Sequence, residues 1–160
     1  MVDPNPAAGG RIRILYDPQT NAYVELPEGR YELVLGREAY DGIPVPILPD
    51  RRRGDSFRLK ENLRDRVGKI MAAVINTISR HHAILYVQDS GVLLRDAGSR
   101  EGTKVDGASL RGSDKHLLSN RKEIQLSAWS LVYYDDPADV ARVMARRPEA
   151  FRLDPRRLGS

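Results

Sequence analysis

Short runs of alternating apolar and polar residues, each bounded by turn residues, constrain the fold of this chain more than any other feature. Residues 81–89, HHAILYVQD, place Ala83, Leu85 and Val87 on one face of an extended segment. That two-residue period is typical of a strand with one buried face. Five further runs have the same character, and turn residues such as proline, asparagine and glycine lie between runs. The five runs cover residues 11–17, 22–29, 30–37, 91–96 and 123–135.

The run at 123–135, EIQLSAWSLVYYD, could form one long strand or two strands joined through Ser127 and Ala128. Either way, many short strands separated by turns predict an all-β fold, a sandwich or a barrel. The length of 160 residues leaves room for one such domain with an insertion or extension. An apolar fraction of 41% can support its core, which argues against wholesale disorder.

Residues 38–78 interrupt the strand pattern as a long basic insertion. It opens with the proline-rich DGIPVPILPD, continues through RRRGDSFRLK and ends in ENLRDRVGKIMAAVINT. The last piece predicts a helix because its apolar residues recur at spacings of three and four. This stripe consists of Leu63, Val67, Ile70, Met71 and Val74. Gly68 weakens the helix, and Val74–Ile75 could instead begin a strand.

A second helix is predicted after the last strand, in DDPADVARVMARRPEAF. Asp136 could cap its start, and Pro137 suits the first helical turn. Val140 lies on a narrow apolar stripe, and Pro148 ends the helix. We expect residues 137–160, this helix and its tail, either to dock on the domain or to meet a partner.

Composition limits the cellular compartment of the protein and the kinds of site that it can contain. The chain has no cysteine, which excludes disulfides, cysteine-based zinc sites and thiol catalysis. It has no apolar run near the roughly 20 residues of a membrane helix, and residues 1–10 lack the apolar core of a signal peptide. We therefore expect a soluble, cytoplasmic protein with a flexible N-terminal tail over residues 1–10 and no membrane partner.

The formal charge is 26 − 22 = +4, which is compatible with an anionic partner but does not name one. Arginines in the insertion and the C-terminal tail raise the alternative of a nucleic-acid-binding accessory protein. Acidic residues are interleaved with them, and the insertion has few aromatics for base stacking. We therefore rank nucleic-acid binding below recognition of an anionic protein partner.

Serine and histidine side chains gather at the mouth of one predicted strand, where Ser79 and Arg80 precede His81 and His82. A hydrolytic triad of Ser79, His82 and Asp96 lacks the nucleophile elbow that such enzymes use. A zinc site built with His116 lacks the ligand spacing, and adjacent strand histidines point to opposite faces. We predict no catalytic residue, no metal and no cofactor.

Three motifs in order, Gly36-Arg37, Ser79-x-x-His82 and RDAGSREGTKVDG at 95–107, together resemble the forkhead-associated (FHA) domain. The resemblance covers residues 11–136. It implies a β-sandwich of about eleven strands, here with a long, partly helical insertion and a short C-terminal helix. It also implies that loops at one end bind phosphothreonine in proteins phosphorylated by a Ser/Thr kinase, without catalysis.

The chemistry of the motifs agrees with that implication. Phosphothreonine carries about −1.5 to −2 charges at neutral pH, and it needs a cation, a hydroxyl donor and backbone N–H groups on loops. By the resemblance, Arg37, Ser79 and Arg100 would hold the phosphate, and Arg80 would add charge at the rim. The residues expected to support the site are Gly36, His82, Asp96, Gly102, Thr103 and Gly107.

Glu101 departs from the family pattern, which usually has asparagine before Gly-Thr. An ionised carboxylate can only accept hydrogen bonds, so it cannot keep the whole exchange with a bound peptide. Glu101 would either select a basic residue downstream of the phosphothreonine or mark a phosphate-independent scaffold. Asp106 replaces another common asparagine and keeps the turn chemistry. The insertion could extend the anion-binding surface, cover the site, or be a solvated decoration.

Overall fold

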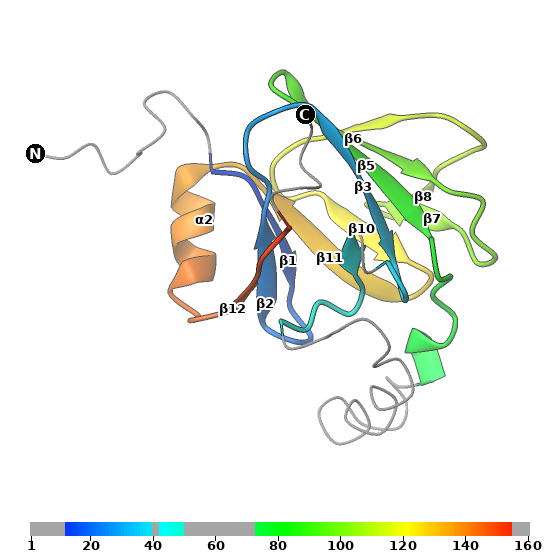
Figure 1. Ribbon diagram of the computed structural model, residues 1–160, viewed down its shortest axis with the longest axis horizontal. Helices are drawn as coiled ribbons and strands as arrows, with labels where there is room; N and C mark the ends of the chain where they lie inside the picture. Colours follow the sequence, from blue (N-terminus) through cyan, green and yellow to red (C-terminus); the bar gives the residue numbers. More distant parts are fainter. Residues whose placement is uncertain (1–11, 40–41, 50–72, 155–160) are drawn as a thin grey trace, which may run out of the picture.

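Two β-sheets packed face to face form a sandwich in the computed structural model, which describes residues 12–39, 42–49 and 73–154 (Figure 1). The seven-stranded sheet has the order β12-β2-β1-β11-β10-β7-β8, and the five-stranded sheet has the order β4-β3-β5-β6-β9. Neighbouring strands are antiparallel except for two edge pairs, β12 with β2 and β3 with β4. The sandwich confirms the predicted fold class.

The elements of the described residues have the following bounds. The seven-stranded sheet contains β1 (Ile14–Asp17), β2 (Ala22–Glu25), β7 (Thr103–Val105), β8 (Ala108–Ser109), β10 (Glu123–Leu126), β11 (Trp129–Tyr134) and β12 (Glu149–Phe151). The five-stranded sheet contains β3 (Tyr31–Gly36), β4 (Ile43–Pro44), β5 (Ala83–Gln88), β6 (Gly91–Asp96) and β9 (His116–Leu118). The helix α2 spans Pro137–Met144.

The core follows the predicted alternation. Ala83, Leu85 and Val87 of β5 are fully buried between the sheets, while the intervening strand residues are partly exposed. The run at 123–135 forms two strands, because β10 and β11 pair as a hairpin through Ser127 and Ala128. Ser127 adopts the left-handed conformation (φ 59°) that this two-residue turn needs.

A buried carboxylate ties separate parts of the sandwich together. Asp17 accepts hydrogen bonds from the indole of Trp129 at 2.9 Å and from the backbone N–H of Ile47 at 3.0 Å. It also accepts from the backbone of its own turn, at Gln19 and Thr20. Burial raises the pKa of Asp17 to about 6, against these hydrogen bonds. The contact to Ile47 holds the beginning of the predicted insertion against the core.

The described beginning of the insertion is part of the fold, not a solvated decoration. Ile43, Val45 and Ile47 are fully buried, and β4 extends the five-stranded sheet beside β3. The prolines between these residues, and Leu48 after them, are buried as well, so the burial here follows no alternating pattern. The predicted stripe from Leu63 to Met71 lies outside the described residues, although Ala73–Ile75 are helical. The predicted tail at 1–10 also lies outside them.

The predicted C-terminal helix is present and docks on the sandwich. Asp136 is its N-cap and accepts a hydrogen bond from the Asp139 N–H, and Pro137 occupies the first turn. Val140 and Val143 pack against Ile14 and neighbouring side chains on the outer face of the seven-stranded sheet.

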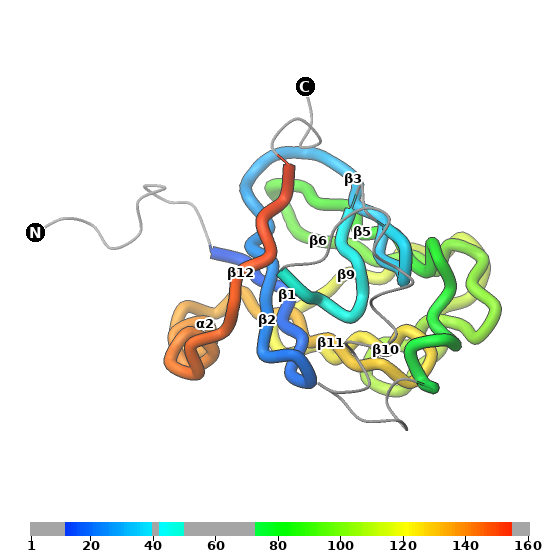
Figure 2. Tube along the Cα trace, turned by 60° about the horizontal axis from the view of Figure 1, so that its bottom comes forward, coloured from blue at the N-terminus to red at the C-terminus, as the bar shows by residue number. Residues whose placement is uncertain are grey.

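The helix ends at Met144, before Pro148, and the chain then forms β12 beside β2 (Figure 2). The sequence patterns did not predict that strand. None of the helices in the described part of the chain is long and apolar enough to cross a membrane.

Candidate functional site

Two of the predicted motifs meet where the end of β3 lies against the segment that leads into β5. The backbone N–H of Arg37 donates to the Ser79 carbonyl at 3.0 Å, and that of His82 donates to the Leu35 carbonyl at 2.7 Å. Gly36 makes this approach possible, because a Cβ there would lie 2.0 Å from the backbone oxygen of Arg80. The Gly-Arg pair therefore has a steric basis: only glycine fits at the closest approach.

Arg37 is held against the loop by its own side chain. Its Nε donates to the carbonyl oxygen of Ile78 at 3.0 Å, and the side chain is 21% exposed. This bond uses one of the five N–H donors of the guanidinium. The orientation of the planar fork is therefore set by the backbone, which pre-organises a cation at the end of the sandwich.

His82 links two of the loops from a fully buried position. Its Nδ1 accepts a hydrogen bond from the Ser79 N–H at 3.0 Å, so Nε2 carries the proton and donates to the Gly102 carbonyl at 2.7 Å. Burial lowers the pKa of His82 below its usual 6.5, although the bond to Gly102 acts in the opposite direction. The imidazole is therefore neutral near pH 7, and it braces the loops.

Ser79 reaches the third motif through its side chain. Its Oγ accepts a hydrogen bond from the backbone N–H of Arg100 at 3.1 Å. The contact of Ser79 with His82 runs through the serine backbone, so the hydroxyl is not aligned on the imidazole as a triad nucleophile would be. Within the described residues, no group of three or more His, Cys, Asp or Glu side chains could hold a metal.

Asp96 organises the loop between β6 and β7. Its carboxylate accepts from the backbone N–H groups of Gly98 and Ser99 at 3.0 Å, from Ser99 Oγ at 2.5 Å and from Thr103 Oγ1 at 2.7 Å. Burial by itself would raise the pKa of Asp96, but these hydrogen bonds outweigh it and lower the pKa. These hydrogen bonds of Asp96, including the one from Thr103, hold the loop in its conformation.

Gly102 follows in the same loop with φ +88°, a left-handed conformation that favours glycine, and its N–H donates to Ser99 Oγ at 2.9 Å. The loop is further tied to the β10–β11 turn, because the Ser127 N–H donates to the Gly102 carbonyl at 3.2 Å. Gly107 lies farther along, in the β7–β8 turn, also with positive φ. The structure therefore places Gly107 apart from the loops that meet at Ser79.

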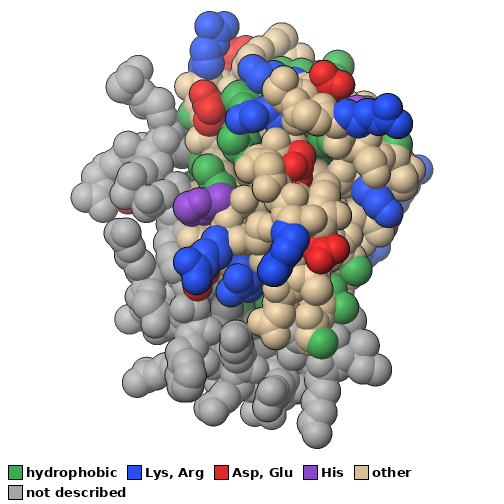
Figure 3. Space-filling model, turned by 90° about the vertical axis from the view of Figure 1, so that its right-hand side faces the viewer, with side chains coloured by type: hydrophobic (Ala, Val, Ile, Leu, Met, Phe, Trp, Pro, Cys, Tyr) green, Lys and Arg blue, Asp and Glu red, His purple; other side chains and the backbone are tan. Residues whose placement is uncertain are grey.

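The charged side chains at the site include one that sequence reasoning missed. Glu38 Oε2 lies 3.1 Å from Arg80 Nε, and Glu38 Oε1 lies 3.9 Å from Arg37 Nη1. The only sequence signal for this contact is that Glu38 follows Arg37 directly. Arg100 and Glu101 have exposed side chains on the β6–β7 loop. On the side of the sandwich shown in Figure 3, lysine and arginine side chains gather beside a histidine, with acidic side chains among them.

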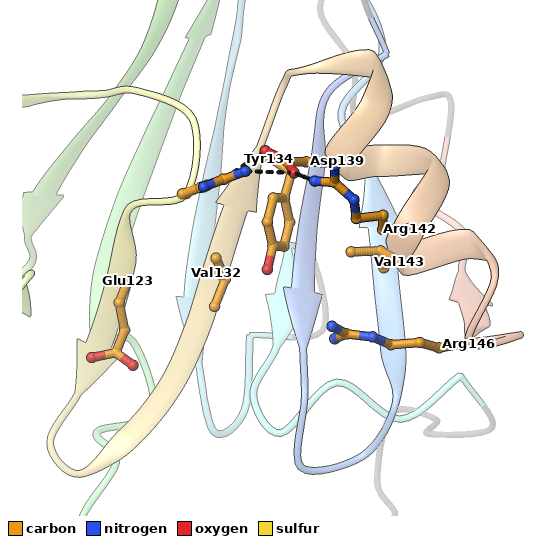
Figure 4. A pocket seen from close by; sticks show the side chains of 8 residues that line it. Glu123, Val132, Tyr134, Asp139, Arg142, Val143 and Arg146 are labelled. Atoms are coloured by element: carbon orange, nitrogen blue, oxygen red, sulfur yellow. Dashed lines mark hydrogen bonds and ion pairs between the residues drawn. The ribbon is translucent and has the colours of Figure 1, made fainter.

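A groove of about 380 Å³ lies away from these loops, between α2 and strands β10 and β11 (Figure 4). Three arginines line it, but two are already paired. Asp139 accepts from Arg121 at 2.7 and 3.0 Å and from Arg142 at 2.5 Å. The guanidinium of Arg146 lies 5.6 Å from the ring centroid of Tyr16. These contacts explain how α2 is held on the sheet, and we assign the groove no ligand.

The comparisons with known proteins agree with this geometry. A family model described as FHA domain matches residues 72–127, which include the Ser79–His82 and Asp96–Gly107 motifs. The sandwich of this chain has the FHA fold. FHA domains are phosphopeptide-binding modules and not enzymes. No curated protein matches the chain in sequence.

Solved FHA structures share the fold at low sequence identity. The FHA domain of the Chlamydia trachomatis protein CT664 is 20% identical, with a TM-score of 0.52 over 78% of this chain and 98% of that chain. The N-terminal FHA domain of S. cerevisiae Rad53p, in complex with a phosphothreonine peptide, is 14% identical, with a TM-score of 0.54 over 82% and 98%.

Mycobacterium tuberculosis EmbR, in complex with a low-affinity phosphopeptide, is 17% identical, with a TM-score of 0.53 over 81% of this chain and 26% of that chain. These likenesses extend the FHA fold beyond the residues that the family model matches.

Proposed function

We propose that this FHA domain binds phosphothreonine in partner proteins that a Ser/Thr kinase has phosphorylated, and that it does so without catalysis. The domain would thereby mediate phosphorylation-dependent protein–protein interaction in the cytoplasm. Arg37, Ser79 and Arg100 would hold the phosphate, and Arg80 would add positive charge at the rim. Gly36, His82, Asp96, Gly102 and Thr103 would keep the loops in the binding shape.

The observation that carries this proposal is the convergence of three loops on Ser79. The Ser79 carbonyl accepts a hydrogen bond from the Arg37 N–H, and Ser79 Oγ accepts one from the Arg100 N–H. A serine hydroxyl has one proton to donate and two lone pairs to accept with. Because Oγ accepts from Arg100, its own proton can be directed to a phosphate oxygen. Arg37 would supply the cation, because its guanidinium is oriented by a hydrogen bond to the Ile78 carbonyl.

The charges suit a phosphate better than a neutral side chain. A phosphothreonine brings about −1.5 to −2 charges and three acceptor oxygens, and charge-assisted hydrogen bonds to such groups are the strong ones. The Rad53p domain with the same fold was solved with a phosphothreonine peptide, which supports assigning this ligand class. Because the sequence identity is low, we infer the peptide preference from the loops of this chain and not from the Rad53p domain.

Glu101 is the residue to which we assign part of that preference. Its side chain is exposed on the β6–β7 loop, directly after Arg100. A carboxylate there can accept hydrogen bonds and attract a cation, but it cannot donate. We expect Glu101 to favour lysine or arginine downstream of the phosphothreonine.

The site is tested by replacing its central cation. Arg37→Ala should reduce phosphopeptide affinity at least about 30-fold, because a hydrogen-bonded charge contributes roughly 2–5 kcal/mol at an interface. Arg30→Ala is a matched control, since Arg30 is exposed in the β2–β3 turn at the opposite end of β3. Titration of both variants with phosphopeptide, with a thermal melt to confirm folding, decides the matter. Retained affinity in folded Arg37→Ala would exclude the mechanism.

A phosphate-independent scaffold is the second candidate, and the carboxylates at the site favour it. Glu38 contacts Arg80 and approaches Arg37, while Glu101 stands on the neighbouring loop. In that case the fold would be retained, and a partner would bind through another surface. A folded domain that captures no phosphopeptide would support the scaffold.

A further inference from the structure

Glu38 lies close to two arginines of the candidate site, Arg37 and Arg80. One carboxylate oxygen lies 3.1 Å from Arg80 Nε, and the other lies 3.9 Å from Arg37 Nη1. The Glu38 side chain is 25% exposed, so it is partly shielded, whereas that of Arg80 is 73% exposed. The arginine charges that would attract a phosphate are thus partly balanced by a carboxylate of the chain itself.

The backbone keeps this carboxylate in place. The N–H of Glu38 donates to the carbonyl of Arg80 at 3.2 Å, in the same ladder that joins Arg37 to Ser79. A group attached beside its target acts at a high effective concentration compared with a group that arrives from solution. An anionic ligand must therefore compete with a tethered carboxylate for the same guanidinium donors.

We propose that Glu38 is a built-in competitor that sets the threshold for anion binding at this site. The proposal rests on the proposed phosphothreonine recognition and adds a role for a residue outside the recognised motifs. In the unliganded domain, Glu38 neutralises Arg37 and Arg80. When a phosphate binds, the carboxylate gives up these contacts and turns to solvent.

The threshold separates phosphorylated segments from segments that are merely acidic. An aspartate or glutamate of a partner would replace one carboxylate by another of equal charge, with little net gain. A phosphate brings more charge and more acceptor oxygens. Its interaction with the arginines therefore exceeds the free energy lost when Glu38 is displaced. Because the displaced group is the same in both cases, removing Glu38 should strengthen both ligands by a similar factor.

The test compares Glu38→Gln with wild type. The probes are a fluorescent degenerate peptide pool with a fixed phosphothreonine and the same pool with glutamate at that position. Glutamine keeps the size of the side chain and removes its charge. Glu28→Gln is the matched control, because Glu28 is exposed in the β2–β3 turn, away from the site, and its loss changes net charge equally.

Glu38→Gln should bind the phosphothreonine pool about twofold to fivefold more tightly than wild type, which is the gain expected from removing a partly exposed ion pair. The glutamate pool should gain by a similar factor, and Glu28→Gln should match wild type with both pools. In an Arg80→Ala background the gain should shrink, because one of the two cations that Glu38 occupies is gone.

The outcomes separate the two proposals. If wild type binds the phosphothreonine pool and Glu38→Gln binds it equally or more weakly, Glu38 is not a competitor, although phosphothreonine recognition stands. If neither protein binds that pool while both remain folded by thermal melt, phosphothreonine recognition fails, and the role of Glu38 fails with it.

Discussion

His82 holds two loops of the candidate site together from a fully buried position. Its two ring nitrogens hold Ser79 on one side and Gly102 on the other, and both bonds need the neutral imidazole with the proton on Nε2. A second proton on Nδ1 would remove the acceptor for the Ser79 N–H. The same burial that lowers the His82 pKa therefore makes the loops sensitive to acid.

We predict that His82 makes the domain less stable below pH 6.5. Its folded-state pKa is depressed, so its contribution to stability is complete above the unfolded value of about 6.5 and is lost as pH falls through the folded pKa. Urea unfolding at pH 7.5 and pH 5.5 measures this loss. His82→Gln should cost about 1–3 kcal/mol at pH 7.5 through broken hydrogen bonds, and it should lose less on acidification than wild type.

The comparison with His82→Gln is needed because another buried group acts in the opposite direction. Burial raises the pKa of Asp17 to about 6, so acidification from pH 6 toward 4 relieves a buried charge and stabilises the fold. This contribution is common to both proteins and cancels in the difference between them. Equal pH dependence in wild type and His82→Gln would contradict the role assigned to His82.

At the scale of elements, the site is built where a strand end meets the approach to the next strand of its sheet. Alternation predicted β3, β5 and β6, and the Gly-Arg motif indicated the end of β3. Which backbone atoms Gly36 meets could not be predicted, because Gly36 and Arg80 are separated by the whole insertion. For the same reason the contact between Glu38 and Arg80 could not be predicted, because it depends on how the end of β3 is aligned with the segment before β5.

Gly36→Ala tests this element-level contact. A Cβ at 2.0 Å from the Arg80 carbonyl oxygen must push the end of β3 away from residues 79–82, and overpacking of this kind costs about 1–3 kcal/mol. We expect lower stability in urea and loss of phosphopeptide binding. Gly112→Ala is the control: Gly112 has positive φ, but a Cβ at this position would meet no atom within 4 Å, so the variant should keep binding. Full binding by folded Gly36→Ala would show that the close approach does not shape the site.

At the scale of the whole molecule, the sandwich has an insertion after β3 and a C-terminal segment made of α2 and β12. Sequence patterns predicted parts of these two additions and missed others. The C-terminal helix was predictable because Asp136, Pro137 and its apolar stripe are local signals. The strand β12 was not, since its pairing with β2 joins residues more than 120 positions apart in the chain. The proline-rich start of the insertion has no helical or simple strand period, so its burial and the hydrogen bond from Ile47 to Asp17 are seen only in the three-dimensional structure.

Capture of peptides from a degenerate phosphothreonine library tests the central claim most directly, with phosphoserine and unphosphorylated libraries as controls. Recognition of phosphothreonine by Arg37, Ser79 and Arg100 predicts selective capture from the first library, with lysine or arginine enriched downstream opposite Glu101. Equal capture from all three libraries, or no capture by a folded sample, would contradict it and favour the phosphate-independent scaffold.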